Sequence, residues 1–247
     1  LTGGVGDTIT GTTIFQQAMG AVVTTLTANG AKGAVANIPD ITTIPFFTTV
    51  PYNGLVLDSA LAAQVNAAMK LFQLPFVYNI GPNPFLVADP TSPHPYFKVR
   101  QMQPGELVLL SVPQDSLKCG GWGIISPHTL TPTPIPTQFV LTADEVAKIK
   151  SATDAYNTII KGLADLKGLA LVDMNSKMKE VQAGIVWDGI KMNAKFVTGG
   201  AFSLDGVHLN PRGCAVAANY FIDAINAKYG STIPWVDVTK YNGIIFP

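Results

Sequence analysis

The chain has 247 residues, with 16 Lys and Arg balanced by 16 Asp and Glu, so its net charge is +0. Charged residues make up only 13% of the sequence, and hydrophobic residues make up 47%. A nucleic-acid partner is not expected, because recognition of phosphates needs a positively charged surface. The length is sufficient for one large domain, or two small ones, with a substantial core.

The composition also bears on location. No apolar run is long enough for a transmembrane helix, and no signal peptide is recognisable. The low charge and the many Thr, Asn and Pro residues favour a secreted or cell-surface protein over a cytosolic enzyme. The chain opens with LTGGVGDTIT and lacks an initiator Met. We therefore expect that Leu1 follows a segment that was cleaved, removed or left out.

The first predicted elements are a helix and a strand. Residues 12–29 predict a helix, which Thr12 or Thr13 can cap and Gly30 can end. Residues 32–39 form a short apolar run that stops at a proline, as in a buried parallel strand. A helix, a short loop and a buried strand in this order are typical of a layered α/β domain.

The middle of the chain predicts less regular structure. A helix is expected at 58–72, with Asp58 as its N-cap, and a strand is expected at 105–113. Proline removes a backbone donor and breaks helices, so the proline-rich segments are expected to be irregular or extended surface connections. These segments are 41–57, 74–100 and 126–137.

A second helix–strand unit follows. Residues 142–167 predict the longest helix, because Thr142 and Glu145 match a capping box. Residues 169–173 predict another buried strand. The two units are separated by what we interpret as an insertion at about 52–141. Two parallel strands do not make a stable sheet, so the domain needs more strands than these residues clearly provide.

Three further elements are expected towards the C-terminus. They are a short helix at 174–182, a β hairpin at 184–197, and a last helix that begins after Asn210 and runs to Tyr229. Pro211 stands at the first position of that helix, where proline is well tolerated.

The two cysteines, Cys119 and Cys214, are far apart and form no CxxC motif. Cys214, Ala218, Phe221 and Ile225 share one face of the last helix. A buried apolar thiol is the preferred interpretation of Cys214, and a disulfide is the alternative.

An acid and a histidine lie three residues apart just before the last helix. Asp205 can reach His208 across a turn in which Gly206 supplies backbone freedom. A carboxylate that fixes the ring of a neutral histidine prepares it to take a proton from a serine hydroxyl. Spacing alone is weak evidence, since such a pair also arises by chance as a surface histidine beside an incidental acid.

The longer string FSLDGVHLNPRG, followed by a helix, resembles the last motif block of the SGNH or GDSL-type serine esterases and lipases. Three other stretches resemble a subgroup of this family found in Bacteroidetes, often as lipoproteins: LTANGAKGAVANIPDITTIPFFTTVPYNG, GELVLLSVPQDSLKCGGWG and YGSTIPWVDV. The resemblance implies a single α/β domain over residues 1–247, a flavodoxin-like three-layer α/β/α sandwich that lacks its first strands. It assigns Asp205 as the orienting acid and His208 as the general base.

The other motif blocks of that family are not in the sequence. There is no GDS block for the nucleophilic serine, no GxND block for the oxyanion hole and no GxSxG elbow. Thr8, in GVGDT, is rejected as a nucleophile because no strand precedes it. The resemblance implies that the serine lies upstream of Leu1, and that the chain alone is inactive. Its substrate would be a carbohydrate or lipid ester, no metal or organic cofactor is expected, and a lipid anchor upstream would be consistent with the subgroup.

Several residues allow two interpretations. Phe46 and Phe47 follow the first strand, where ligands bind in open α/β sheets, but they could equally cover the core under a loop. His94 and His128 lie in proline-rich loops without partners at ligand spacing and are expected to be solvated. Asp173 ends a strand and could frame the site or cap the next helix.

Two alternatives to an esterase remain open. One is a non-catalytic surface module that binds glycans or proteins on a degenerate hydrolase scaffold. The other is a purely structural domain of a larger lipoprotein.

Overall fold

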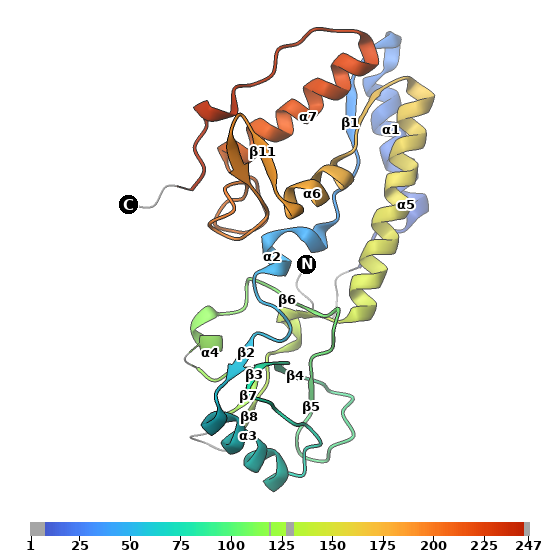
Figure 1. The fold of residues 1–247 in the computed structure, drawn as a ribbon. Helices are drawn as coiled ribbons and strands as arrows, with labels where there is room; N and C mark the ends of the chain where they lie inside the picture. The colour runs from blue at the N-terminus through green and yellow to red at the C-terminus, as the bar shows by residue number, and fades with distance from the viewer. Residues whose placement is uncertain (1–7, 119, 127–130, 245–247) are drawn as a thin grey trace. The chain divides into compact units, whose positions relative to one another are not determined.

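The computed structural model describes residues 8–118, 120–126 and 131–244. They form two compact units of mixed α/β structure (Figure 1). Unit 1 spans residues 47–146, and unit 2 combines residues 8–46 with the residues from 147 onwards. The segment 52–141, interpreted from the sequence as an insertion, lies inside unit 1. No helix of the described residues has both the length and the apolar composition needed to cross a membrane.

The two predicted helix–strand units meet in unit 2. Strand β1 (Ala34–Ala36) pairs in parallel with β10 (Ala170–Val172), and Val35 lies opposite Leu171. Helices α1 (Thr12–Leu26) and α5 (Ala143–Lys167) precede these strands. Val23, Ala164 and Leu169 form the buried cluster between them. The prediction of parallel strands, each preceded by a helix, is confirmed. Ala170 and Val172 of β10 are buried as expected, whereas all three residues of β1 are only half-buried, so the expected burial of the first strand was wrong.

The start of α5 is set by the predicted capping box. The Glu145 carboxylate accepts a hydrogen bond from the Thr142 backbone N–H at 2.8 Å, and the Glu145 N–H donates to the Thr142 hydroxyl at 3.3 Å. Gly168 follows the helix with φ 65°, a left-handed conformation that favours glycine. These local signals explain why the boundaries of α5 agree with the sequence prediction.

The C-terminal elements of unit 2 also form as predicted. They are α6 (Met174–Ala183), the antiparallel hairpin of β11 (Ile185–Trp187) and β12 (Ile190–Met192), and α7 (Pro211–Tyr229). Val216 and Tyr220 of α7 pack with Val172 of β10 in one core cluster.

The environment of Cys214 differs from the prediction. Cys214 is an exposed, free cysteine, and Cys119 lies outside the described residues. The buried face of α7 includes Gly213, Val216 and Tyr220, so it is offset from the face on which Cys214 lies. The preferred interpretation of a buried thiol was therefore wrong for Cys214.

Unit 1 is built from one longer helix and short antiparallel strand pairs. Helix α3 (Ser59–Leu71) is capped by Asp58, whose carboxylate accepts the Leu61 N–H, as predicted. The strand pairs are β2 (Leu55–Leu57) with β3 (Gly81–Asn83), β4 (Leu86–Ala88) with β5 (Val99–Gln101), β6 (Leu107–Val108) with β9 (Val140–Leu141), and β7 (Ile124–Ile125) with β8 (Pro132–Thr133). Two short helices, α2 (Pro45–Thr48) and α4 (Gln114–Lys118), are also present, and α2 lies across the boundary between the units. Over both units, the described residues form 3₁₀ turns at Ala28–Gly30, Ile41–Thr43, Thr137–Phe139 and Val238–Lys240.

Two predictions for the middle of the chain were wrong. Segment 74–100 is not a simple loop, because it contributes to β3, β4 and β5. The predicted strand 105–113 is reduced to the two residues of β6.

The proline-rich segment 126–137 was predicted to be an extended surface connection, but its described part is not one, since Ile135 is completely buried. Its N–H donates to the Leu86 carbonyl and its carbonyl accepts from Ala88. The prolines at 132, 134 and 136 alternate with residues that can donate, so the backbone pairs on one side without losing donors.

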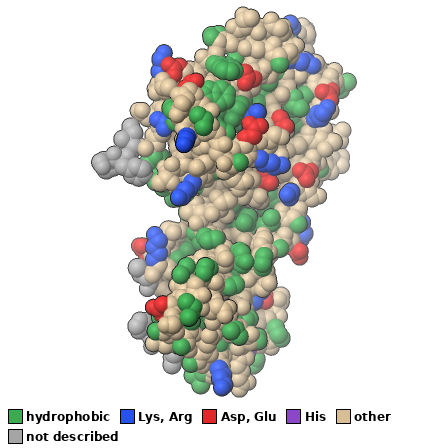
Figure 2. Space-filling view, viewed as in Figure 1, with side chains coloured by type: hydrophobic (Ala, Val, Ile, Leu, Met, Phe, Trp, Pro, Cys, Tyr) green, Lys and Arg blue, Asp and Glu red, His purple; other side chains and the backbone are tan. Residues whose placement is uncertain are grey.

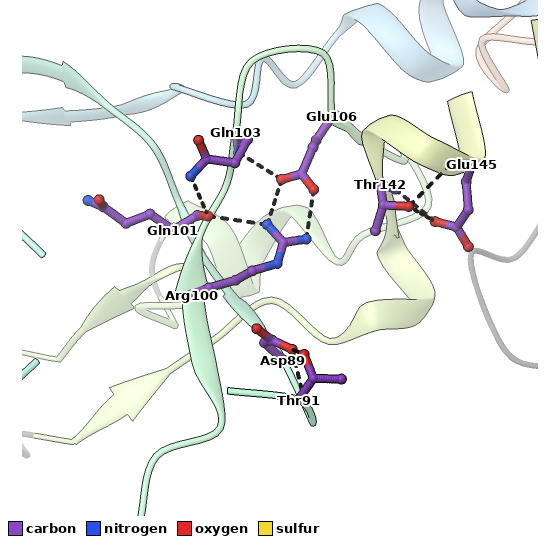
Figure 3. Close-up of polar contacts among 8 residues, drawn as sticks. All are labelled: Asp89, Thr91, Arg100, Gln101, Gln103, Glu106, Thr142 and Glu145. Carbon is purple, nitrogen blue, oxygen red and sulfur yellow. Dashed lines mark hydrogen bonds and ion pairs between the residues drawn. The ribbon is translucent and has the colours of Figure 1, made fainter. Parts of the chain in front are cut away.

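One ion pair fastens the end of β5 to the loop before β6. The Arg100 guanidinium donates to both oxygens of Glu106 at 2.7 Å, and the Gln103 N–H donates to the same carboxylate at 2.7 Å (Figure 3). Glu106 is 5% exposed. A carboxylate buried to this extent needs such partners, because desolvation of an unpaired charge is costly.

Candidate active site

The Asp205–His208 pair lies in a short closed loop between β12 and α7. The Asn210 N–H donates to the Ala201 carbonyl at 3.0 Å, and the Ser203 N–H donates to the His208 carbonyl at 2.8 Å. Gly206 has φ 72° at the tip of the loop, where a side chain would be strained. The backbone bonds therefore hold the acid and the histidine on one rigid turn.

The Asp205 carboxylate is surrounded by donors from its own loop. One oxygen, Oδ1, accepts from the Ser203 hydroxyl at 2.5 Å and from the N–H groups of Val207 and His208, both at 2.9 Å. The other, Oδ2, lies 2.6 Å from Nδ1 of His208. The carboxylate is thus oriented by three donors and presents its second oxygen to the ring.

These donors determine the charge of Asp205. The Ser203 hydroxyl, followed by the His208 ring and the two backbone N–H groups, holds the pKa of Asp205 well below its usual range. At neutral pH the carboxylate is ionised and can only accept, so Nδ1 of His208 must donate to it. In a neutral imidazole the lone pair then lies on Nε2.

The far side of the His208 ring is open. The His208 side chain is 81% exposed, and Nε2 has no hydrogen-bond partner among the described residues. An oriented ring with a free lone pair can accept a proton from a hydroxyl brought against it. An acid that orients a histidine, together with a free lone pair on the second ring nitrogen, is an arrangement suited to general-base chemistry.

Asn210 joins the loop to α7. The residue is 5% exposed, and its side chain donates to the carbonyls of Gly200 and Phe202 at 3.0 and 3.1 Å and accepts the Gly213 N–H at 2.9 Å. One buried amide therefore caps the helix and supports the base of the loop. From the sequence, we predicted only that the last helix begins after Asn210.

The sequence did not single out two further residues at the site, Ser203 in the loop and Gly213 in the first turn of α7. The Ser203 hydroxyl stands only two residues before the aspartate that it bonds. Gly213 allows close approach of α7, because a Cβ at this position would overlap the Ala201 carbonyl. Both residues belong to the FSLDGVHLNPRG string.

The two phenylalanines proposed to bind substrate have different environments. The Phe46 N–H donates to the Gly206 carbonyl at 2.9 Å, so this half-buried residue contacts the tip of the loop through its backbone. Phe47 is 2% exposed and has little surface to offer a ligand. Its burial favours the alternative interpretation, in which it covers the core.

Asp173 caps α6, since its carboxylate accepts the Ser176 N–H at 3.2 Å. The Asn37 side chain also donates to it at 2.7 Å, which joins the ends of β1 and β10. Asp173 does not contact the Asp205–His208 pair through any hydrogen bond of the described residues.

The remaining histidines do not join the site in the described structure. His94 is not a solvated surface residue as predicted, since backbone groups of its own unit bond both of its ring nitrogens. His128 lies outside the described residues. Within residues 8–118, 120–126 and 131–244, no group of three or more His, Cys, Asp and Glu side chains could hold a metal ion.

Comparisons of the chain with protein-family models, with curated proteins and with solved structures found no match.

Proposed function

We propose that this chain is part of a serine ester hydrolase of the SGNH or GDSL type, with His208 as the general base and Asp205 as its orienting acid. The observation that carries the proposal is the 2.6 Å contact between Nδ1 of His208 and Oδ2 of Asp205, combined with an Nε2 atom that is open to solvent. The carboxylate is held by three other donors of its loop, which fixes the oxygen that faces the histidine ring.

The reaction would proceed in two steps. A serine Oγ attacks the ester carbonyl carbon while Nε2 of His208 takes the hydroxyl proton and then delivers it to the leaving alcohol. In the second step Nε2 deprotonates a water whose oxygen attacks the acyl carbon, the bond to the serine Oγ breaks, and the imidazolium returns the proton to that oxygen as the acid leaves. Asp205 stays ionised throughout and stabilises the imidazolium that forms in each step.

The nucleophile is proposed to come from a segment outside the 247 residues. Ser203 is the serine nearest the pair in the sequence, but its hydroxyl donates to Asp205 rather than to His208. Since the chain has no GDS or GxND block, it would lack both the nucleophile and the oxyanion donors. We therefore expect the isolated chain to be inactive.

The proposal also includes a specific fold. Unit 2 would be part of a flavodoxin-like three-layer sandwich, with β1 and β10 as neighbouring strands of its sheet, and 52–141 would be an insertion in that single domain. The substrate would be a carbohydrate or lipid ester. The low charge supports a secreted, periplasmic or cell-surface location, and a lipid anchor upstream would fit it.

The test is hydrolysis of nitrophenyl acetate by the polypeptide that includes the residues encoded ahead of Leu1. Wild type should hydrolyse the ester, and His208→Ala should not. Equal rates for the two proteins would overturn the proposal. A fluorophosphonate probe should label the extended protein on one serine and leave the 247-residue chain unlabelled. Stoichiometric labelling of the shorter chain would contradict the assignment of the nucleophile to another segment.

A further inference from the structure

Unit 1 contains a groove of about 320 Å³ between the C-terminal end of α3 and the loop at 94–97. Aromatic rings form much of its lining, contributed by Phe72, His94, Tyr96 and Phe97. Gln73 adds a side-chain amide at the end of α3. The groove therefore combines flat aromatic faces with a polar group that can both donate and accept hydrogen bonds.

The rings are fixed before any ligand arrives. Nδ1 of His94 accepts the Phe97 N–H at 3.0 Å, and Nε2 donates to the Phe72 carbonyl at 3.0 Å. The His94 ring stacks on Phe97 with centroids 5.3 Å apart, and Phe97 meets Phe72 edge to face at 5.1 Å. A rigid surface loses little conformational entropy on binding, which favours recognition.

Tyr96 is exposed to solvent beside the rings of Phe72, His94 and Phe97. The residue is 85% exposed, although its ring centroid lies only 6.4 Å from that of His94. Tyrosine offers a large apolar face and a hydroxyl at low entropic cost, which suits it to contact ligands. The exposed face of Tyr96 is therefore available to a ligand that enters the groove.

Gln73 occupies a position where glycine would be preferred. It follows the end of α3 with φ 54°, and the Leu74 N–H donates to the Met69 carbonyl at 2.9 Å, as in a helix-ending turn. Glycine adopts this conformation without strain, whereas glutamine does not. Gln73 is exposed, and its side-chain amide has no hydrogen-bond partner among the described residues, so the amide can bond a ligand. The strained residue thus places an exposed amide at the groove, and strain of this kind is a reason to look for function.

The charge of the groove restricts the class of ligand. None of the described residues that line it is an Asp, Glu, Lys or Arg. Figure 2 likewise shows few charged side chains over the elements of unit 1 on the face that it displays. A phosphate, a sulfate or an acidic glycan would need a cation in the lining. The ligand is therefore expected to be neutral.

We propose that this groove binds a neutral carbohydrate. The C–H face of a pyranose would stack on Tyr96 and the neighbouring rings, and the sugar hydroxyls would bond the Gln73 amide and the tyrosine hydroxyl. An apolar protein segment or a lipid tail would contact the rings but offer no partner to the exposed Gln73 amide, whereas a sugar hydroxyl would add hydrogen bonds to it. The proposal does not rest on the hydrolytic role of His208.

The test is affinity electrophoresis of the 247-residue chain in native gels that contain xylan, glucomannan, mixed-linkage β-glucan or starch. At least one of these polysaccharides should retard the wild type. Tyr96→Ala should raise the dissociation constant roughly ten-fold, because it removes a stacking ring. Gln73→Gly should raise the dissociation constant about five-fold, because it removes hydrogen bonds to the sugar.

The stability of Gln73→Gly separates binding from structure. This variant relieves the left-handed strain, so its Tm should equal or exceed that of the wild type while its affinity falls. Tyr241→Ala, which removes a partly exposed tyrosine from unit 2, is the matched control and should bind like the wild type.

Three results would overturn the proposal. The first is that no polysaccharide retards the wild type. The second is that both groove variants bind as the wild type does. The third is that neutral phosphatidylcholine vesicles, but no polysaccharide, bind the wild type and lose that binding with Tyr96→Ala.

Discussion

His208 in unit 2 and His94 in unit 1 are held in similar ways but are available for different chemistry. Each ring is fixed at Nδ1 by its own loop, by the Asp205 carboxylate in one case and by backbone N–H groups in the other. Nε2 of His94 is bonded to the Phe72 carbonyl, whereas Nε2 of His208 has no partner among the described residues. Whether each histidine can take part in proton transfer therefore depends on whether its Nε2 atom already has a hydrogen-bond partner.

The partner at Nδ1 also differs in kind. A carboxylate accepts a hydrogen bond, so it leaves the lone pair of a neutral ring on Nε2 of His208. Backbone N–H groups donate, so they place the lone pair of His94 on Nδ1 and leave Nε2 as a donor. The first arrangement suits a base, and the second suits a structural link that holds an aromatic surface.

The largest expected effect is the loss of activity when the His208 ring, with its unbonded Nε2, is removed. If the proposal is right, His208→Ala should reduce kcat for nitrophenyl acetate by roughly 10⁵-fold or more in a protein that includes the proposed upstream serine, because the variant lacks the proposed acceptor of the hydroxyl proton. Steady-state kinetics on purified protein measures this. A loss smaller than about ten-fold would mean that His208 is not the base.

Removing the orienting charge should have the next largest effect. Asp205→Asn should reduce kcat roughly 10³- to 10⁴-fold, because an amide can stabilise the wrong tautomer and cannot stabilise the imidazolium. Asp237→Asn is the matched control, since Asp237 also accepts bonds from its own turn but contacts no histidine through the bonds described. Its kcat should match the wild type, and an equal loss in both variants would contradict the specific role of Asp205.

Within unit 1, the buried ion pair should dominate stability. Arg100→Met leaves the Glu106 carboxylate buried without its partner and should lower the free energy of unfolding by about 3 kcal/mol. Lys161→Met breaks an ion pair whose side chains are both 64% exposed. It should cost less than about 0.5 kcal/mol in the same urea titration. Similar losses for the two variants would show that burial does not decide the strength of these pairs.

The two histidines should contribute unequally to stability. His94→Ala removes hydrogen bonds to three backbone groups and should cost about 2 kcal/mol in urea unfolding. His208→Ala removes an exposed ring and should cost less than about 0.5 kcal/mol. The reverse order would contradict the division between a structural and a reactive histidine.

The smallest effect is a pH dependence. The pKa of Asp205 is lowered in the folded protein, so its ionised form adds stability above the unfolded value of about 4, and this stability is lost as the pH falls towards the folded pKa. The difference in unfolding free energy between wild type and Asp205→Asn should therefore be present at pH 7 and shrink at pH 3. A difference that stays constant between these pH values would mean that the carboxylate is not stabilised by its loop.

Local signals made some elements predictable from the sequence. The Thr142–Glu145 capping box, the Asp58 cap of α3 and Asn210 with Pro211 at the start of α7 act within one helical turn of the residues they affect. The reach of Asp205 to His208 across a glycine turn is equally local. These caps and this turn can be predicted from neighbouring residues alone, without knowing which distant residues pack against them.

Other features depend on contacts between distant residues. Pairing of β1 with β10, the burial of Ile135 beside Leu86, and the exposure of Cys214 each depend on what packs against them. The hydrogen bond from Ser203 to Asp205 lies between these two kinds of feature. The two residues are close in the sequence, but the serine hydroxyl had several other partners within reach, so the sequence alone did not identify this bond.

By itself, the sequence determined where most of the helices begin and end, and that an acid and a histidine would share one loop. Only the tertiary structure decided which nitrogen of each histidine is available, which aromatic rings gather at the end of α3, and that Glu106 is buried against Arg100. The physical reason is that caps and turns are satisfied by neighbours in the chain, whereas burial and ring accessibility depend on groups that the fold brings together.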